Sequence, residues 1–368
     1  MKIKGKSLKS LDMKNAFINS LYALVFSLLL GMVFISITGY SPLDTYRAIF
    51  VSSFSSTKNF ALTLSQATPL MFTGIAFALA YRVKMINTGA EGQMYAGAIT
   101  AALVGAYITN LPGIIHIPLA LLVAAAAGGF TAGIVGYAKL KTGANEIIMT
   151  LMLNNVVIFI TGYLANGPLK PEGSGVGQTE RIQESAKLMK LIPQTQLTIA
   201  LLIVIAVAII LQYMLDRTVF GYEMKVTGFN LRAAQVAGIK VSKASLITFT
   251  ISGAVAGLGG AAMVLGVNYR FIEGFSSGYG FAGISIAALA AYSPLAVIPA
   301  AFLIGILRAG TITLSRTTAI PIEVVDVIQV LIIIFVAAPS MIRAITGNFK
   351  KLVTKFTSNN EKSGGIEQ

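Results

Sequence analysis

The sequence predicts an all-α polytopic membrane protein with about ten transmembrane helices, and three observations support this fold class. First, 55% of its 368 residues are hydrophobic and only 11% are charged, whereas about a quarter of the residues in a soluble domain are charged. Second, several apolar runs approach the roughly 20 residues that a helix needs to cross the hydrocarbon core. Third, Lys and Arg gather on alternate connections between these runs. Lipid is therefore expected to be the main solvent of this chain.

The candidate spans are apolar runs bounded by charged residues, Pro or Gly. In order along the chain they cover residues 15–38, 59–81, 89–109, 117–138, 145–165, 194–215, 244–267, 280–292, 294–314 and 322–341. The eighth run is too short to cross comfortably, so one interpretation is a half-helix, which is tolerated where protein or water satisfies its ends. Ten crossings would place both termini on the same side of the membrane.

The positions of Lys and Arg orient these spans. If the N-terminus lies inside, the interior segments carry more than twice as many Lys and Arg as the exterior segments. This positive-inside asymmetry predicts that both termini are cytoplasmic. It also accounts for the net charge of +14 without nucleic acid, since aromatic residues are not interleaved with the basic ones as a base-stacking surface requires.

The expected domain organisation follows from these spans. We expect residues 1–14 to be a cytoplasmic segment, residues 15–346 to be the transmembrane domain, and the polar residues 347–368 to be a disordered cytoplasmic tail. Within the transmembrane domain, residues 166–193 are the longest exterior loop and residues 216–243 form a cytoplasmic segment.

The composition disfavours several kinds of chemistry. The absence of cysteine excludes disulfides, thiolate metal sites and cysteine nucleophiles. No G-x-x-x-x-G-K-[ST] phosphate loop occurs, so the chain does not bind ATP by that route. The single histidine, His116, falls in a predicted outer turn and is interpreted as incidental, because a lone histidine makes a poor metal or acid–base site. We therefore expect neither an enzyme nor a metal or cofactor in this chain.

Three charged residues fall within the last two spans, and one of them, Glu323, lies close to the outer surface. Arg308 and Asp326 would each lie about 6 to 9 Å below the outer surface, at a rise of 1.5 Å per residue. They are predicted to neutralise each other as an intramembrane pair, and a role in the substrate path is the alternative. Carboxylates within the spans are otherwise sparse, which disfavours an ion-coupled carrier.

Adjacent amides lie inside the fifth span. Asn154 and Asn155 each need a hydrogen-bonding partner in hydrocarbon. They could bond to a neighbouring helix, or they could face a cavity and bind a ligand. Small residues at 124–129 and 253–262 are interpreted instead as sites of close helix packing.

A possible internal repeat relates the two halves of the chain. Residues 95–103, YAGAITAAL, match residues 281–289, FAGISIAAL, at five positions. The first lies on an expected outward span and the second on an inward one, so the pair would be an inverted repeat, from which midplane substrate sites are often built. Chance recurrence of Ala- and Gly-rich helices is the alternative.

The cytoplasmic segment carries a motif. Residues 223–239 have apolar residues at three- and four-residue spacings, which predicts one or two short amphipathic helices that end at Gly238. The motif itself consists of Gly228, Asn230, Ala233, Ala234, Gly238 and Ile239. By itself such a basic loop could serve only to fix topology.

This motif resembles the coupling segment of ABC importer permeases of the sugar, nucleoside and branched-chain amino-acid branch. NTGAEGQMYAGA at 87–98, GANEIIMTLMLNN at 143–155 and GYGFAGISIAAL at 278–289 are similar to segments of the same family. The purine-nucleoside permeases are the best match. The resemblance implies an importer in which a lipoprotein delivers the ligand, a second and different permease subunit completes the path, and ATPase subunits hydrolyse ATP.

Two sets of site residues are expected. The resemblance implies that Gly228, Asn230, Ala233, Ala234 and Gly238 contact the ATPase subunit, and that Asn87, Glu91 and Gln93 border the inner end of the substrate path. Other polar residues expected along the path are Asn145, Glu146, Asn154 and Asn155. Local chemistry offers another role for Glu91, because Thr88-Gly-Ala-Glu91 fits a capping box that would begin the third span.

Four other functions remain open at this point. Within the family, the cargo could be a simple sugar or a branched-chain amino acid. Outside it, the chain could be an ion-coupled secondary transporter that works alone, or a structural membrane protein. The nucleoside importer, in the plasma membrane of a prokaryote, is the function that the resemblance favours.

Overall fold

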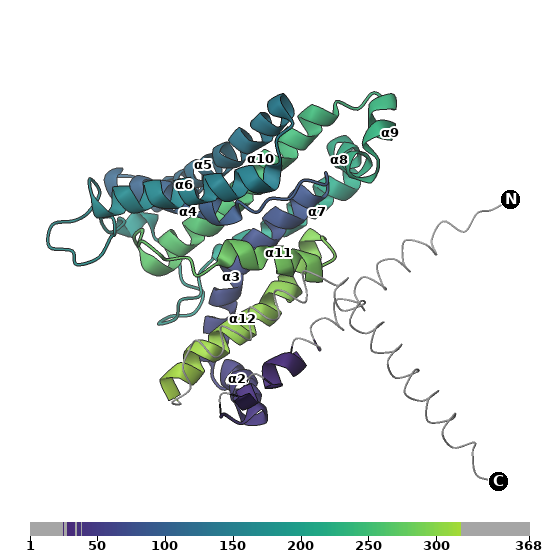
Figure 1. Cartoon of the computed structure of the whole chain (residues 1–368). Helices are drawn as coiled ribbons and strands as arrows, with labels where there is room; N and C mark the ends of the chain where they lie inside the picture. The colour runs from purple at the N-terminus through teal and green to yellow at the C-terminus, as the bar shows by residue number, and fades with distance from the viewer. Residues whose placement is uncertain (1–24, 26–27, 34, 38, 318–368) are drawn as a thin grey trace, which may run out of the picture.

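The computed structural model describes residues 25, 28–33, 35–37 and 39–317, and this part of the chain is helical, with no β-strand (Figure 1). The expected terminal segments 1–14 and 347–368, the tenth span at 322–341 and most of the first span lie outside the described residues.

The helices follow one another with few long connections. In chain order they are α2 (Pro42–Phe54), α3 (Thr57–Tyr81), α4 (Ala90–Tyr107), α5 (Gly113–Thr142), α6 (Glu146–Asn166), the 3₁₀ turn η1 (Glu184–Ala186), α7 (Ala200–Arg217), α8 (Val219–Phe229), α9 (Leu231–Val236), α10 (Val241–Met263), its π-helical extension η2 (Val264–Asn268), α11 (Tyr279–Leu289) and α12 (Pro294–Thr317).

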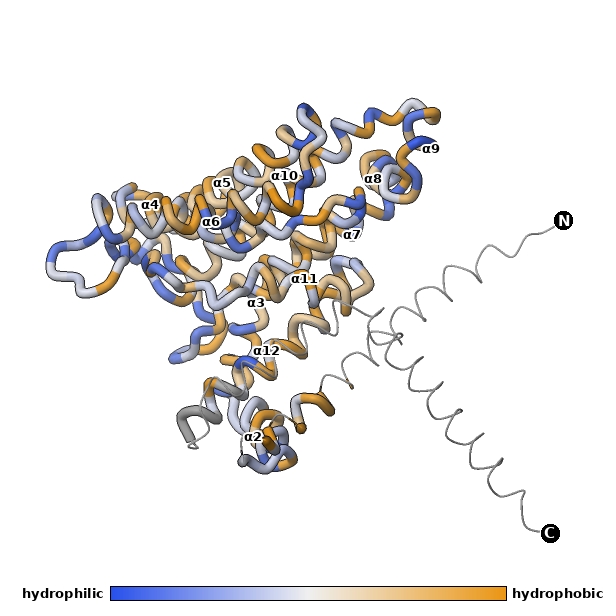
Figure 2. Tube along the Cα trace, in the orientation of Figure 1, coloured by the Kyte–Doolittle hydropathy of each residue, from blue (hydrophilic) through white to orange (hydrophobic). Residues whose placement is uncertain are grey.

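The long helices have the length and composition of membrane spans. Among the described residues, five helices are long and apolar enough to cross a membrane: α3, α5, α6, α7, and α10 with η2. The pair α11 and α12, bent by 119°, passes the same test together. Hydrophobic residues run along the bundle, and hydrophilic residues gather in a loop at one end and around α8 and α9 at the other (Figure 2). The predicted fold class, an all-α polytopic membrane protein, is confirmed, although the described part does not establish a count of ten spans.

The two ends of the bundle carry different structures. We call the end with residues 167–199 the loop end and the end with α8 and α9 the knob end. At the loop end, backbone N–H groups of Thr179, Ile182 and Leu188 donate to carbonyls between Leu265 and Phe271 at 2.9 to 3.0 Å. Residues 167–199 are therefore fixed against the end of α10 and the segment that follows it.

One helix, α2, was not predicted from the sequence. α2 begins at Pro42 after Ser41, whose hydroxyl accepts a hydrogen bond from the N–H of Asp44 at 3.4 Å. Proline in the first turn and a serine cap are strong helix-start signals. The sequence does not reveal this helix as a span, because α2 has only 13 residues and is too short to form a long apolar run.

Small residues let α10 pack closely against α4 and α5. A Cβ atom placed on Gly257 would overlap the carbonyl oxygen of Ala124, and one placed on Gly260 would overlap that of Met94. Gly128 faces Gly253 in the same way. Backbones can approach this closely only where side chains are absent. The interpretation of 124–129 and 253–262 as packing sites is therefore confirmed.

The repeated stretches run in opposite directions. Along α10, Ser252 lies near Ala76 and Asn87, and further on Gly259 lies near Phe72 and Met94. Hence α4 runs parallel to α10, and α3 runs antiparallel to both. α11 runs parallel to α3, since Thr73 contacts Tyr279 and Tyr81 contacts Tyr292. Residues 95–103 and 281–289 thus lie on antiparallel helices, as an inverted repeat requires.

α11 is the short helix that the sequence predicted at 280–292. Its 11 residues span about 16 Å, roughly half of the hydrocarbon thickness. An irregular segment with a turn leads from Tyr269 at the loop end to the start of α11, and the bend at Ala291 and Tyr292 follows the end of α11. Both bend residues have positive φ, 47° and 58°, which is uncommon for side chains other than glycine.

Candidate functional site

The starts of α4 and α11 meet inside the bundle. The Glu91 carboxylate, in the first turn of α4, accepts a hydrogen bond from the backbone N–H of Gly280 at 2.5 Å. A Cβ atom on Gly280 would overlap the backbone of Glu91. Only 4% of Glu91 is exposed. The carboxylate therefore lies at the positive ends of two helix dipoles, which stabilise a negative charge.

The predicted capping box is wrong. α4 has no side-chain cap at its start, and the Thr88 hydroxyl bonds to the Thr150 hydroxyl of α6 at 2.6 Å. Glu91 accepts its hydrogen bond from α11 instead of from its own helix. Tertiary partners displaced the local ones because the segment before α4 is buried between other helices, where hydroxyl and carboxylate groups find donors from neighbouring elements.

Asn87 and Gln93 form a reciprocal pair of amides. Each side chain donates its N–H to the other's oxygen, at 2.8 and 2.9 Å. The Asn87 amide also donates to the Ser252 hydroxyl, which itself donates to the Ala76 carbonyl at 2.7 Å. All three side chains are buried. This network joins α3, the segment before α4, and α10, and it supplies the partners that buried amides need.

Asn154 joins the same region from α6. Its side-chain oxygen accepts a hydrogen bond from the Gly92 N–H. A Cβ on Gly92 would come within 2.7 Å of that oxygen, so glycine allows the two helices to approach. We call Asn87, Glu91, Gln93, Asn154 and Ser252 the buried polar cluster. Four of its five members were predicted from the sequence as residues of a substrate path, and Ser252 was not.

Three other predicted path residues lie away from this cluster. Asn145 caps α6 by accepting from the Ile147 N–H at 2.9 Å. Glu146 pairs with Lys139 at 2.8 Å. Asn155 is exposed and donates to the Leu151 carbonyl of its own helix at 3.1 Å. The structure therefore separates the adjacent amides: Asn154 faces the bundle and Asn155 faces outward.

Other polar groups adjoin the cluster at the start of α11. The Tyr279 hydroxyl donates to the Gln66 side chain at 2.6 Å. The Arg308 guanidinium lies 4.3 Å from the centre of the Tyr279 ring and donates to the Ser277 carbonyl at 3.0 Å. The predicted partner of Arg308, Asp326, lies outside the described residues. Sequence reasoning missed Gln66 and Tyr279, because a single Gln or Tyr in an apolar helix carries no pattern.

Aromatic rings cover the cluster on the side of the loop end. Tyr95, one turn after Glu91, lies 4.7 Å from Phe275 and 5.9 Å from Phe271, measured between ring centroids. Both Phe residues belong to the irregular segment before α11. These rings therefore pack together on the loop-end side of Glu91.

The histidine has a structural role. His116 is not in a turn as predicted but in the first turn of α5, and it is fully buried. Its ring nitrogens contact the Ser185 hydroxyl at 2.9 Å and the Val104 carbonyl at 3.0 Å. It thus ties α5 to α4 and to residues 167–199. The described part of the chain holds no group of three or more His, Asp or Glu residues that could bind a metal ion.

The motif at the knob end forms two short helices, α8 and α9, as expected. The Asn230 side chain caps α9 by accepting from the Ala233 N–H at 3.1 Å. Ala234 is buried, whereas Ala233 faces outward. Gly238 follows α9 with φ +78°, which confirms the predicted helix end.

The knob, which consists of α8 and α9, packs on the end of α3. A Cβ on Gly228 would overlap the Arg82 carbonyl oxygen, so α8 rests directly on the segment that leads to the buried polar cluster. Burial lowers the pKa of Arg82, and the Asp216 carboxylate opposes that shift. Arg82 stays cationic, because arginine does not lose its proton in proteins. The apolar side chains of Phe229 and Val236 are 94% and 90% exposed.

Comparison with known proteins identifies the family. A family model described as "Branched-chain amino acid transport system / permease component" matches residues 59–337. The guanosine ABC transporter permease protein NupP of Bacillus subtilis is 34% identical over 337 residues, which cover 90% of this chain and 96% of that protein. The nucleoside ABC transporter permease protein NupB of Lactococcus lactis is 29% identical over 341 residues, 90% of this chain and 93% of its own.

A third relative has a different cargo. The glucose ABC transporter permease protein of Haloferax volcanii is 32% identical over 319 residues, 84% of each chain. No solved structure matches. The chain belongs to the permease family whose model it matches.

Proposed function

We propose that this chain is the transmembrane permease subunit of an ABC importer that takes up nucleosides. The structural observation that carries the proposal is the buried polar cluster, which lies where α4 and the half-helix α11 begin on antiparallel elements. Interrupted helices in inverted repeats supply polar backbone and side-chain groups to substrate sites in many transporters. Amides and carboxylates are costly inside a membrane, and those that occur there mark substrate paths by default.

The chemistry of the cluster fits an uncharged, polar cargo. Amide, hydroxyl and backbone groups can donate to and accept from the hydroxyls and base edges of a nucleoside. The names of the two relatives reported first, for guanosine and for nucleosides, favour this cargo. A simple sugar is the second candidate, because a sugar offers similar hydroxyls and the glucose permease is nearly as similar. A branched-chain amino acid, the cargo in the family's description, fits this polar cluster less well.

The knob supports a partner ATPase. α9 and the end of α8 present Phe229 and Val236 to solvent, and large exposed apolar residues mark interaction sites. We infer that an ATPase subunit binds here and hydrolyses ATP, and that Gly228, Asn230, Ala233, Ala234 and Gly238 shape the contact. ATP would then be bound by the partner chain.

Two more partners complete the proposed transporter. A second permease subunit, a different chain, would cover the exposed face of α6. A substrate-binding lipoprotein would dock at the loop end, where residues 167–199 form a fixed surface. With the positive-inside distribution of Lys and Arg, this assembly puts the loop end outside and both termini in the cytoplasm of a prokaryotic cell.

Uptake by the reconstituted transporter tests the proposal. Liposomes that hold both permeases and the ATPase are given the lipoprotein and radiolabelled guanosine, with ATP inside. We expect guanosine uptake that stops when the ATPase is inactivated and that excess unlabelled guanosine, but not glucose or leucine, suppresses. Suppression by glucose would favour the sugar importer instead. Uptake by this chain alone, driven by an ion gradient, would overturn the proposal in favour of a secondary transporter.

A further inference from the structure

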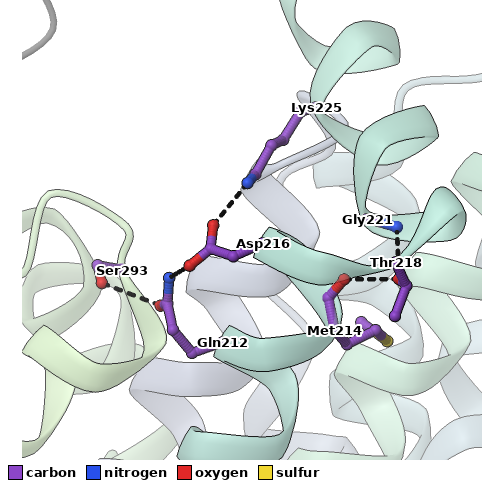
Figure 3. Close-up of polar contacts among 7 residues, drawn as sticks. All are labelled: Gln212, Met214, Asp216, Thr218, Gly221, Lys225 and Ser293. Carbon is purple, nitrogen blue, oxygen red and sulfur yellow. Dashed lines mark hydrogen bonds and ion pairs between the residues drawn. The ribbon is translucent and has the colours of Figure 1, made fainter. Parts of the chain in front are cut away.

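A row of polar side chains joins α8 to the bend between α11 and α12 (Figure 3). Lys225 of α8 pairs with the Asp216 carboxylate of α7 at 2.6 Å. The other Asp216 oxygen accepts from the Gln212 amide at 2.6 Å, and the Gln212 oxygen accepts from the Ser293 hydroxyl at 3.2 Å. We call Lys225, Asp216, Gln212 and Ser293 the inner polar link.

One end of the link moves with the knob. α8 starts directly after α7, where the Thr218 hydroxyl donates to the Met214 carbonyl at 2.6 Å and accepts from the Gly221 N–H at 3.1 Å. A Cβ on Gly221 would overlap the Met214 carbonyl, so the start of α8 lies against the last turn of α7. A displacement of the knob would therefore reach Lys225 and, through it, Asp216.

The other end of the link holds the bend. Ser293 directly follows Ala291 and Tyr292, the two residues with positive φ. The Tyr292 ring stacks on that of Tyr81 with centroids 3.9 Å apart. The backbone carbonyl of Ser293 accepts from the Val297 N–H in the first turn of α12. Ser293 therefore lies at the junction of the two helices, where its own N–H donates to the Ala290 carbonyl at the end of α11, and the opposite end of α11 contacts Glu91.

Helix stability does not explain the link. Asp216 lies in the last turn of α7, where the helix dipole disfavours a carboxylate. Its pairing with Lys225 is half exposed, and such surface ion pairs contribute little to stability. The Ser293 hydroxyl stands where it could cap α12, yet it bonds to Gln212 of another helix. These groups are arranged to connect elements and not to strengthen any one of them.

We propose that the inner polar link positions the α11–α12 bend according to the state of the knob, and so couples ATP hydrolysis to movement at the buried polar cluster. This inference rests on the proposed function. Gln212 and Asp216 act as positioning residues, because neither touches the cluster. The link connects α8 to the inner end of α11, and the Gly280 contact with Glu91 connects the outer end of α11 to the cluster.

The test measures guanosine uptake and ATP hydrolysis in the same liposomes, with the complete transporter. Gln212→Leu has a side chain of similar size that cannot bond to Asp216 or Ser293. We expect ATP hydrolysis within about twofold of wild type and guanosine taken up per ATP reduced about tenfold, as the loss of two hydrogen bonds, one of them to a charged group, would predict. Ser293→Ala should act in the same direction, and Ser293→Thr, which keeps the hydroxyl, should restore coupling.

A double variant distinguishes the loss of the Gln212–Ser293 contact from a general loss of transporter function. Gln212→Leu with Ser293→Ala should be no worse than Gln212→Leu alone, because both changes break the same contact. Tyr213→Leu, at the exposed neighbouring position, is the matched control and should couple normally. Three results would overturn the proposed link. Uptake per ATP could be unchanged in both single variants, the losses of the two single variants could add in the double variant, or hydrolysis and uptake could fall in parallel. A wild-type transporter that takes up no guanosine would instead overturn the proposed function.

Discussion

At the residue scale, Glu91 shows how a buried carboxylate finds its hydrogen-bonding partner on another helix. The Gly280 N–H and the positive dipole ends of α4 and α11 face its carboxylate. Oriented backbone N–H groups favour the charged form of a carboxylate. The sequence identified Glu91 as a helix-start residue correctly, but it assigned the wrong helix, because spacing reveals only partners that are close in the chain.

Two substitutions distinguish capping of α11 by Glu91 from a role of Glu91 in the substrate path. Glu91→Gln keeps an oxygen for the Gly280 N–H, so we expect nearly normal folded yield. Glu91→Ala leaves that buried N–H unpaired and should cost about 1–3 kcal/mol, measured as a lower midpoint in thermal unfolding of the detergent-solubilised protein. Glu184→Gln, in the loop, is the control and should change neither the folded yield nor the midpoint of thermal unfolding. Equal stability of the Ala and Gln variants would contradict the capping role. If the Gln variant folds normally but takes up less guanosine, the charge of Glu91 has a role in the substrate path.

At the element scale, α6 combines a buried face with an unusual exposed one. Five of its exposed residues, Ile148, Met152, Asn155, Phe159 and Tyr163, form a stripe with spacings of three and four, and Leu151, Val156 and Ile160 are exposed beside it. This is the seam spacing of paired helices, in which a single Asn often fixes register. Within the described part of the chain, no group donates to the Asn155 side-chain oxygen. An unpaired amide oxygen is costly in hydrocarbon, so a partner helix is expected here.

Photo-cross-linking locates that partner. Benzoylphenylalanine in place of Phe159 on α6 should form a product in the assembled transporter whose peptides come from the second permease subunit. The same probe in place of Phe130, an equally exposed residue of α5, should react only with lipid. Products of Phe159 that contain only lipid, or only peptides from residues 318–368 of the same chain, would contradict this interface.

At the scale of the whole molecule, the loop end and the knob end define opposite membrane faces. The absence of native cysteine makes any introduced cysteine unique. We expect a membrane-impermeant maleimide to label Val176→Cys, in the loop, on intact cells. Val236→Cys, in the knob, should react only after permeabilisation, because the positive-inside distribution assigns the knob to the cytoplasm. The reverse pattern would invert the proposed orientation.

Much of the fold was readable from the sequence, because hydrocarbon imposes simple rules. Apolar runs near 20 residues, the short run at 280–292 and the small residues of α10 each reflect one physical requirement: spanning length, a half-crossing, or close backbone approach. α2 was not predicted, since a short helix at the edge of the bundle obeys none of these. The resemblance to the permease family indicated Asn87, Glu91 and Gln93 of the buried polar cluster, and the need of an amide for a partner in hydrocarbon indicated Asn154.

The sequence by itself determined that this chain is a polytopic helical protein, which family it resembles, and which polar residues lie within its spans. Only the tertiary structure decided what those residues contact: Glu91 with α11, Asn154 inward and Asn155 outward, and Gln212 between α8 and the α11–α12 bend. The reason is physical. Hydrophobicity and helix periodicity act locally along the chain, whereas a buried hydrogen bond is completed by whichever element packing brings within reach.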